Sequence, residues 1–316
     1  MTLAGSFAKR RCARLGVGVE RRFRVDHETE ILGVCHWQPE PQRAPTLVLL
    51  HGLEGSVDSS YMVGTAEKAY VAGFNAVRLN QRNCGAGEAL TPSLYNSSLS
   101  CDPRAVVLEL AERDRLPEIF VCGWSMGGNL VLKMVGEFGA LPPSALRGAV
   151  GVAPSVNLSA SSDAISERQN FLYEWHFVCN LKRRTGRKIA LYPERYAVIR
   201  TDGLRRVRTV RQFDDVVVAP VFGYRDAEDY YQRASALNTI AQISIPTLMI
   251  AAQDDTFVPF RTFEHPAIRG NSKITVLAPE YGGHCAFISA YDGDERFWEE
   301  ARIIEFCTQH SKVVRA

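Results

Sequence analysis

Short apolar runs alternate with longer stretches of helical pattern along most of this chain. Six runs have the length and apolar character of buried strands, and they cover residues 46–50, 74–80, 118–122, 148–153, 246–251 and 274–278. The predicted helices cover residues 60–73, 103–114, 128–135 and 294–308, and an alternating segment at 20–37 predicts an edge hairpin. Strands that alternate with helices indicate a mostly parallel, doubly wound sheet with helices on both faces.

One long segment, residues 157–240, interrupts this alternation. It is rich in Arg, Tyr and Phe and lacks a strand pattern, so we interpret it as a helical cap inserted into the α/β domain. Its basic pairs, such as Arg183-Arg184, are interleaved with aromatic residues; we expect them to form the solvated face of the cap, and peripheral contact with a lipid surface is the alternative. Residues 1–19 are expected to be a poorly ordered lead-in, which leaves 20–316 as a single domain.

Composition narrows the classes of partner. The chain has 316 residues, of which 46% are hydrophobic and 23% charged, as in ordinary soluble globular proteins. Its net charge of +2 is too small to indicate a nucleic-acid partner. No apolar run has the length of a membrane-spanning helix, and the eight cysteines show no metal or redox spacing. We therefore expect a cytoplasmic protein without a metal or other cofactor.

The strongest chemical signal directly follows the predicted strand at 118–122. The sequence Gly123-Trp124-Ser125-Met126-Gly127 is a G-x-S-x-G motif between a strand and a helix, the context of a nucleophile elbow. Such a turn strains the serine backbone and presents its hydroxyl at the tip. The positions two before and two after the serine must be small, and both are glycine here. Ser125 is therefore the predicted nucleophile.

A serine hydroxyl needs a histidine to take its proton and a carboxylate to orient that histidine. The acid is expected in the loop after the strand at 246–251, where Asp255 has the better position and Asp254 is the alternative. The base is expected after the next strand, where Gly282-Gly283-His284 follows, because two glycines allow the backbone to bend His284 toward the elbow. His265 is the strongest rival, but it precedes that strand.

The negative oxygen of a tetrahedral intermediate needs two preorganised donors, usually backbone N–H groups. Met126 directly follows the predicted nucleophile at the start of a helix, so its N–H is one candidate. The other candidate is the N–H of Leu53, in the H-G-x-x-G loop 51–55 after the first buried strand. A third loop, 80–87, contains Cys84; we expect a structural loop held by its polar side chains rather than a catalytic thiol.

These segments resemble the α/β-hydrolase superfamily and, within it, the YheT-like hydrolases, which are related to mammalian abhydrolase-domain lipases and yeast ethanol acyltransferases. The resemblance rests on segments 51–55, 80–85, 123–129 and 282–284 and on a more specific run from 213 through 235 to 255. It implies an α/β-hydrolase fold and ester hydrolysis by a Ser-Asp-His triad, with short- to medium-chain acyl groups. Asn83 stands where glycine is common in the family, a change that we expect to be tolerated.

Three functions remain open at this point. The first is a carboxylesterase or lipase that cleaves a small-molecule or lipid-like ester through an acyl-enzyme on Ser125. The second is an acyltransferase, which forms the same acyl-enzyme but passes the acyl group to an alcohol. The third is an inactive binding module, which the presence of a nucleophile, an acid, a base and an oxyanion loop in the expected order disfavours.

Overall fold

The computed structural model describes residues 14–290 and 296–314. Most of the predicted lead-in at 1–19, and the first residues of the helix predicted at 294–308, lie outside these ranges. Among the described helices, none is long and apolar enough to cross a membrane.

An eight-stranded sheet forms the centre of the molecule, with the strand order β1-β2-β4-β3-β5-β6-β7-β8. The strands are β1 Val19–Arg24, β2 Glu30–His36, β3 Thr46–Leu50, β4 Asn75–Leu79, β5 Ile119–Trp124, β6 Leu146–Val152, β7 Thr247–Ile250 and β8 Ile274–Leu277. β1 pairs with β2 and β2 with β4 in antiparallel register, so the predicted edge hairpin is confirmed. The remaining pairs are parallel, as the alternation of strands and helices predicts.

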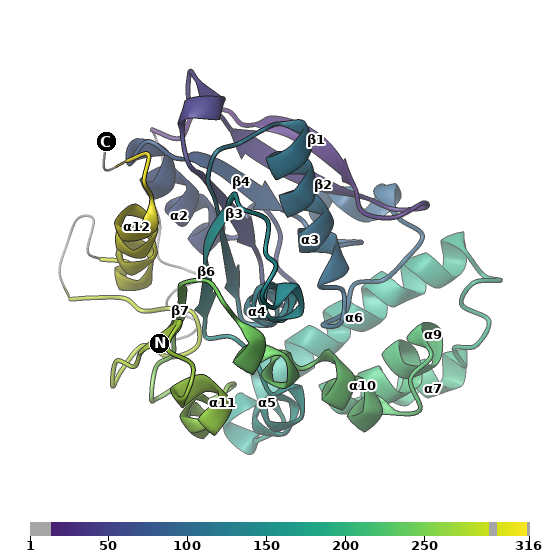
Figure 1. The fold of residues 1–316 in the computed structure, drawn as a ribbon. Helices are drawn as coiled ribbons and strands as arrows, with labels where there is room; N and C mark the ends of the chain where they lie inside the picture. The colour runs from purple at the N-terminus through teal and green to yellow at the C-terminus, as the bar shows by residue number, and fades with distance from the viewer. Residues whose placement is uncertain (1–13, 291–295, 315–316) are drawn as a thin grey trace.

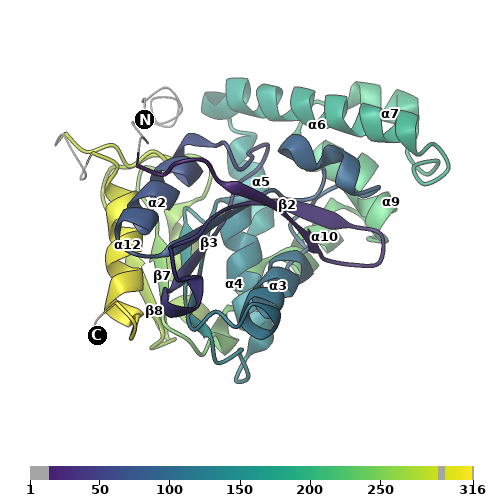
Figure 2. The same ribbon diagram turned by 90° about the horizontal axis from the view of Figure 1, so that it is seen from above.

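Helices cover both faces of the sheet and one of its ends (Figures 1 and 2). They are α2 Ser60–Val71, α3 Cys101–Leu108, α4 Met126–Phe138, α5 Leu158–Ile165, α6 Phe171–Leu191, α7 Thr201–Arg206, α8 Val210–Phe213, α9 Ala219–Phe222, α10 Ala227–Ala234, α11 Pro266–Arg269 and α12 Trp298–His310. Two π-helical turns, Glu109–Arg113 and Asp214–Val218, extend α3 and α8.

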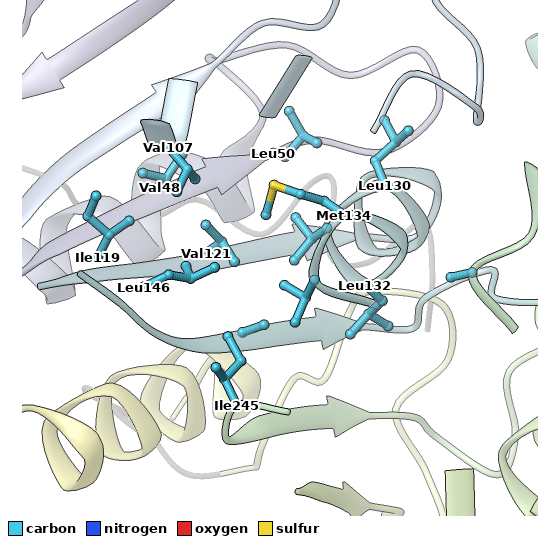
Figure 3. Packing of buried hydrophobic residues seen from close by; sticks show 14 of the residues in the cluster. Val48, Leu50, Val107, Ile119, Val121, Leu130, Leu132, Met134, Leu146 and Ile245 are labelled. Atoms are coloured by element: carbon cyan, nitrogen blue, oxygen red, sulfur yellow. The ribbon is translucent and has the colours of Figure 1, made fainter. Parts of the chain in front are cut away.

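The alternation of side chains along each strand divides the core into two layers. In β3, Val48 and Leu50 pack in one cluster with residues of α3 and α4 (Figure 3). Leu47 and Leu49 face the other way and pack in a second cluster with residues of α2 and α12. Because all four side chains are almost completely buried, β3 lacks a solvent-facing side, which explains its continuous apolar sequence.

The segment between β6 and β7 is helical from α5 to α10, as the absence of a strand pattern predicts. It leaves the sheet after Val152, at the carboxyl end of β6, and α5, α6, α7, α9 and α10 gather beyond that end (Figure 1). A third buried cluster lies there and joins side chains of this insertion to Tyr95 and Met126 of the α/β part. The insertion thus packs on the end of the sheet where parallel strands of this architecture carry their functional groups.

Candidate active site

The G-x-S-x-G segment forms a sharp turn between β5 and α4. Ser125 has φ 52° and ψ −117°, a left-handed conformation that strains a non-glycine residue. Its carbonyl accepts the N–H of Asn129 at 3.0 Å, so α4 begins directly at the turn, two residues before the predicted start. A Cβ on Gly123 would lie 2.2 Å from the Gly127 carbonyl oxygen, and one on Gly127 would lie 2.4 Å from two backbone oxygens. Both positions require glycine.

Three sequence-predicted side chains from different loops meet at this turn. The Ser125 hydroxyl lies 2.9 Å from Nε2 of His284. Nδ1 of His284 lies 2.9 Å from Oδ2 of Asp255. The loop that carries His284 needs both of its glycines, because Gly283 has φ 60° and a Cβ on Gly282 would lie 2.6 Å from the Phe287 ring. His265 is absent from this cluster and instead accepts the N–H of Ala267 at the start of α11.

The two neighbouring aspartates of the β7 exit loop make different contacts. Oδ1 of Asp255 accepts the backbone N–H groups of Phe257 at 2.8 Å and Val258 at 3.1 Å, which leaves Oδ2 aimed at the histidine. Oδ1 of Asp254 accepts the N–H groups of Gly282 at 2.8 Å and Gly283 at 2.7 Å. Asp254 therefore supports the histidine loop from behind, while Asp255 contacts the imidazole itself.

The surroundings of His284 change its proton affinity. Burial alone lowers the pKa of an imidazole, because it disfavours the charged form. Here the Asp255 carboxylate, with Cys285, opposes burial and raises the pKa of His284 well above its ordinary value. With Asp255 accepting from Nδ1–H, Nε2 of the neutral ring is the acceptor that faces the serine hydroxyl.

The two candidate oxyanion donors belong to two segments that adjoin Ser125. The loop that carries Leu53 packs against the elbow so closely that a Cβ on Gly52 would lie 3.2 Å from Cβ of Ser125. Leu53 and Met126 both line the cavity in front of Ser125. In the ranges that the structure describes, neither of their backbone N–H groups donates a hydrogen bond. Both are therefore free to bind a ligand oxygen.

A largely buried ion pair that the sequence did not reveal holds the Leu53 loop. Glu54 has φ 58°, its N–H donates to the Tyr95 hydroxyl at 3.2 Å, and its Oε1 accepts from the same hydroxyl at 2.6 Å. Nη2 of Arg184 lies 3.3 Å from Oε2 of Glu54, and Nη1 donates to the Asn83 carbonyl. Arg184 belongs to α6, so the insertion is tied directly to the loop beside Ser125. No spacing in the sequence connects these residues.

The loop after β4 has a structural role, as expected. Nε and Nη2 of Arg82 donate to the two oxygens of Asp102 at 2.7 and 2.6 Å, a buried bidentate pair. Asn83 has φ 60°, the left-handed region that asparagine tolerates better than most residues, so its substitution for glycine costs little. Burial raises the pKa of the Cys84 thiol to about 12, so the reactive thiolate is not formed near neutral pH.

A cavity of about 890 Å³ opens in front of Ser125. Its walls are mostly apolar and come from both the α/β part and the insertion, including Leu158, Phe177, Phe213, Val218 and Phe257. A cavity of this size and character accommodates a small organic or lipid-like molecule. Within the described ranges, no group of three or more His, Cys, Asp or Glu side chains is placed to hold a metal ion.

Comparison with known proteins agrees with this architecture. Residues 45–291 match the family described as alpha/beta hydrolase fold. YheT of Escherichia coli (strain K12), which is provisionally named an esterase, is 31% identical over 87% of this chain and 80% of its own length. Mouse phospholipase ABHD3 is 28% identical over 77% of this chain, and yeast monoacylglycerol lipase is 28% identical over 83%. The chain spans only 58% of each of these last two proteins.

Among solved structures, Pyrococcus furiosus esterase Pf2001 superimposes with a TM-score of 0.61 at 14% identity, over 96% of this chain and 97% of that one. At that identity the likeness concerns the fold alone. The sheet order, the family match and the similarity to YheT together show that this chain belongs to the α/β-hydrolase fold family, among the hydrolases related to YheT.

Proposed function

We propose that the protein is a serine hydrolase that cleaves carboxylic esters through an acyl-enzyme on Ser125. The observation that carries the proposal is the continuous chain of contacts from Ser125 Oγ to His284 Nε2 and from His284 Nδ1 to Asp255 Oδ2, each 2.9 Å long, at the wall of an apolar cavity. This is the arrangement that activates a serine hydroxyl.

In the proposed reaction, His284 takes the hydroxyl proton while Ser125 Oγ attacks the ester carbonyl carbon. The carbonyl oxygen becomes negatively charged and is stabilised by the N–H groups of Leu53 and Met126, which donate to no other described group. The intermediate collapses as the protonated His284 gives its proton to the departing alkoxide, which leaves as the alcohol. Water, activated by the same histidine, then releases the acid from Ser125.

Two observations support an ester substrate of small or moderate size. The cavity is mostly apolar and holds about 890 Å³, enough for a short or medium acyl chain together with an alcohol group. The similarity to YheT, ABHD3 and monoacylglycerol lipase, by their names an esterase and two lipid hydrolases, favours esters over amides.

We further propose that residues 20–316 form one domain in which 157–240 act as a cap, since helices of that segment wall the cavity.

The proposal is tested with a fluorophosphonate probe, which reacts covalently with activated serines, and with p-nitrophenyl esters of increasing chain length. We expect the wild-type protein to be labelled once and to hydrolyse these esters. Ser125→Ala should abolish labelling and lower kcat at least about 10³-fold. Ser244→Ala, which removes a hydroxyl bonded to the Gly139 carbonyl far from the cavity, is the matched control. A folded wild-type protein that neither reacts with the probe nor cleaves any ester refutes the proposal.

A further inference from the structure

One part of the mostly apolar cavity wall carries a group of buried polar side chains. Asp214, at the start of the π turn after α8, and Tyr231 of α10 lie there beside Ser161 and Ser162 of α5. All four side chains line the cavity and are at least nine-tenths buried. The proposed ester chemistry uses none of them.

The Asp214 carboxyl has only one of its two oxygens occupied. The Tyr231 hydroxyl donates to Oδ2 at 2.6 Å and also lies 3.1 Å from Oγ of Ser162. Within the described ranges, Oδ1 of Asp214 has no hydrogen-bond partner. Oδ1 keeps some exposed surface, unlike the completely enclosed atoms that lack partners, and Asp214 is one of the residues that line the cavity.

Two more polar atoms around this cavity lack partners in the described part of the chain. They are Oγ of Ser161 and Nδ2 of Asn96, both completely buried. Asn96 adjoins Ser97, whose N–H donates to the Tyr230 hydroxyl at 2.7 Å, and the Tyr230 ring lies 5.3 Å from the Tyr231 ring. Ser161 and Asn96 both line the cavity, but these two atoms are themselves enclosed, whereas Oδ1 of Asp214 keeps exposed surface.

Leaving such groups unsatisfied costs free energy, because a buried polar atom without a partner loses its hydration and gains nothing in return. Burial raises the pKa of Asp214 to about 7. The charge of Arg211 opposes this rise in the pKa of Asp214 only weakly, and its guanidinium forms its ion pairs with Asp163 at 2.8 Å and Glu228 at 2.9 Å. The Tyr231 hydroxyl needs only Oδ2 of Asp214 as its acceptor. Oδ1 of the same carboxyl is therefore left for a ligand.

We propose that Asp214, held by Tyr231 and flanked by Ser161 and Asn96, forms a subsite that binds a hydroxyl group of the ester substrate. A hydroxyl both donates and accepts, so it satisfies the open carboxyl oxygen in either protonation state without bringing a charge into the apolar cavity. This inference rests on the proposed function and adds to it a substrate class, esters that carry a free hydroxyl in their alcohol or their acyl part.

The test uses pairs of esters that differ only by a hydroxyl in place of a methyl group. In the alcohol arm, 2-hydroxyethyl, 3-hydroxypropyl and 4-hydroxybutyl butyrates are compared with propyl, butyl and pentyl butyrates. In the acyl arm, ethyl 6-hydroxyhexanoate is compared with ethyl heptanoate. The readout is the ratio of kcat/KM within each pair, which cancels changes that affect catalysis in general.

We expect Asp214→Leu to lower this ratio at least about tenfold in one arm, because the site then lacks a partner for the hydroxyl. The kcat/KM for the methyl-ended esters should stay within about threefold. Asp214→Asn keeps an acceptor for Tyr231 and a polar group toward the cavity, so it should retain most of the ratio. Tyr231→Phe keeps the ring but removes the hydroxyl that holds the Asp214 carboxyl in position, so it should also lower the ratio. It gives an independent readout if Asp214→Leu does not fold.

The matched control is Asp215→Asn, at the adjacent carboxylate, which accepts the N–H of Ala227 outside the cavity wall. An unchanged ratio in both arms for folded Asp214→Leu and Tyr231→Phe, with ester hydrolysis intact, refutes the hydroxyl subsite alone. Equal losses for both members of every pair also refute it, because they indicate a structural role. The absence of Ser125-dependent hydrolysis with every ester refutes the proposed function, and the subsite with it.

Discussion

Replacement of Asp255 by asparagine should inactivate the protein by forcing the wrong tautomer on His284. Oδ1 of Asp255 accepts two backbone N–H groups, from Phe257 and Val258. An asparagine places its carbonyl oxygen there, so its NH₂ group faces Nδ1 of the imidazole. Nδ1 then becomes an acceptor and the proton moves to Nε2, which can no longer accept the proton of the Ser125 hydroxyl.

The size of the effect follows from these contacts. Turning the asparagine amide over restores the tautomer, but it sets the NH₂ group against two buried N–H donors. Each lost and unsatisfied hydrogen bond costs roughly 2 kcal/mol, so the productive orientation is disfavoured by about 4 kcal/mol. At about 1.4 kcal/mol for each tenfold change in rate, kcat falls about 10³-fold.

Asp254→Asn is the matched control. Asp254 also accepts two N–H groups through Oδ1, from Gly282 and Gly283, and an asparagine oxygen keeps both bonds while leaving the His284 ring untouched. We expect less than about a tenfold loss. Steady-state hydrolysis of p-nitrophenyl butyrate measures both variants. An Asp255→Asn protein within tenfold of wild type, or a larger loss for Asp254→Asn, refutes the reasoning.

The remaining predictions concern the pH profile, the elbow and the insertion. Because Asp255 raises the pKa of His284 in the free protein, wild-type kcat/KM should fall as the pH drops through a value above the ordinary pKa of histidine. The residual kcat/KM of Asp255→Asn should persist to lower pH, and acid limbs that coincide for the two proteins contradict this. Gly127→Ala places a Cβ 2.4 Å from backbone oxygens and should lower the free energy of unfolding in urea by about 3 kcal/mol or more. In the control, Gly186→Ala in α6, the added Cβ has no atom within 4 Å, and the free energy of unfolding should rise by up to about 1 kcal/mol. Equal changes in the free energy of unfolding for the two variants refute the close-contact argument. Arg184→Met leaves the buried Glu54 carboxylate without its cation and should lower kcat roughly tenfold, because the Leu53 loop then loses its support. Its control, Arg183→Met, loses only an exposed contact with Asn180 and should leave kcat unchanged. Equal kcat values for the two variants refute a link between Arg184 and the Leu53 loop.

The local pattern of apolar residues was enough to predict most strands of the sheet and the order of strands and helices along the chain. The strand predicted at 46–50 matches β3, and the G-x-S-x-G motif predicts the strained turn at Ser125. Helix ends were less accurate, because the turn at Ser125 supplies the first carbonyl of α4 and starts that helix two residues early. A serine at an elbow and a histidine after paired glycines are local signals, since each depends on the backbone that its own neighbours allow.

Other features became visible only when distant segments met. The sequence favoured Asp255 over Asp254 but left both open. The contact of Asp255 with the imidazole, and of Asp254 with the backbone at 282–283, depends on where the histidine loop lies. The Glu54–Arg184 pair joins residues 130 positions apart, and the cavity that Asp214 lines is enclosed by segments that range from residue 52 to residue 285. The sequence by itself predicted the strands and the candidate nucleophile, because these signals arise from periodicity and backbone strain. Only the tertiary structure decided which acid pairs with the histidine and what chemistry the cavity wall presents, because hydrogen bonds and burial depend on distances between segments that the order of residues does not contain.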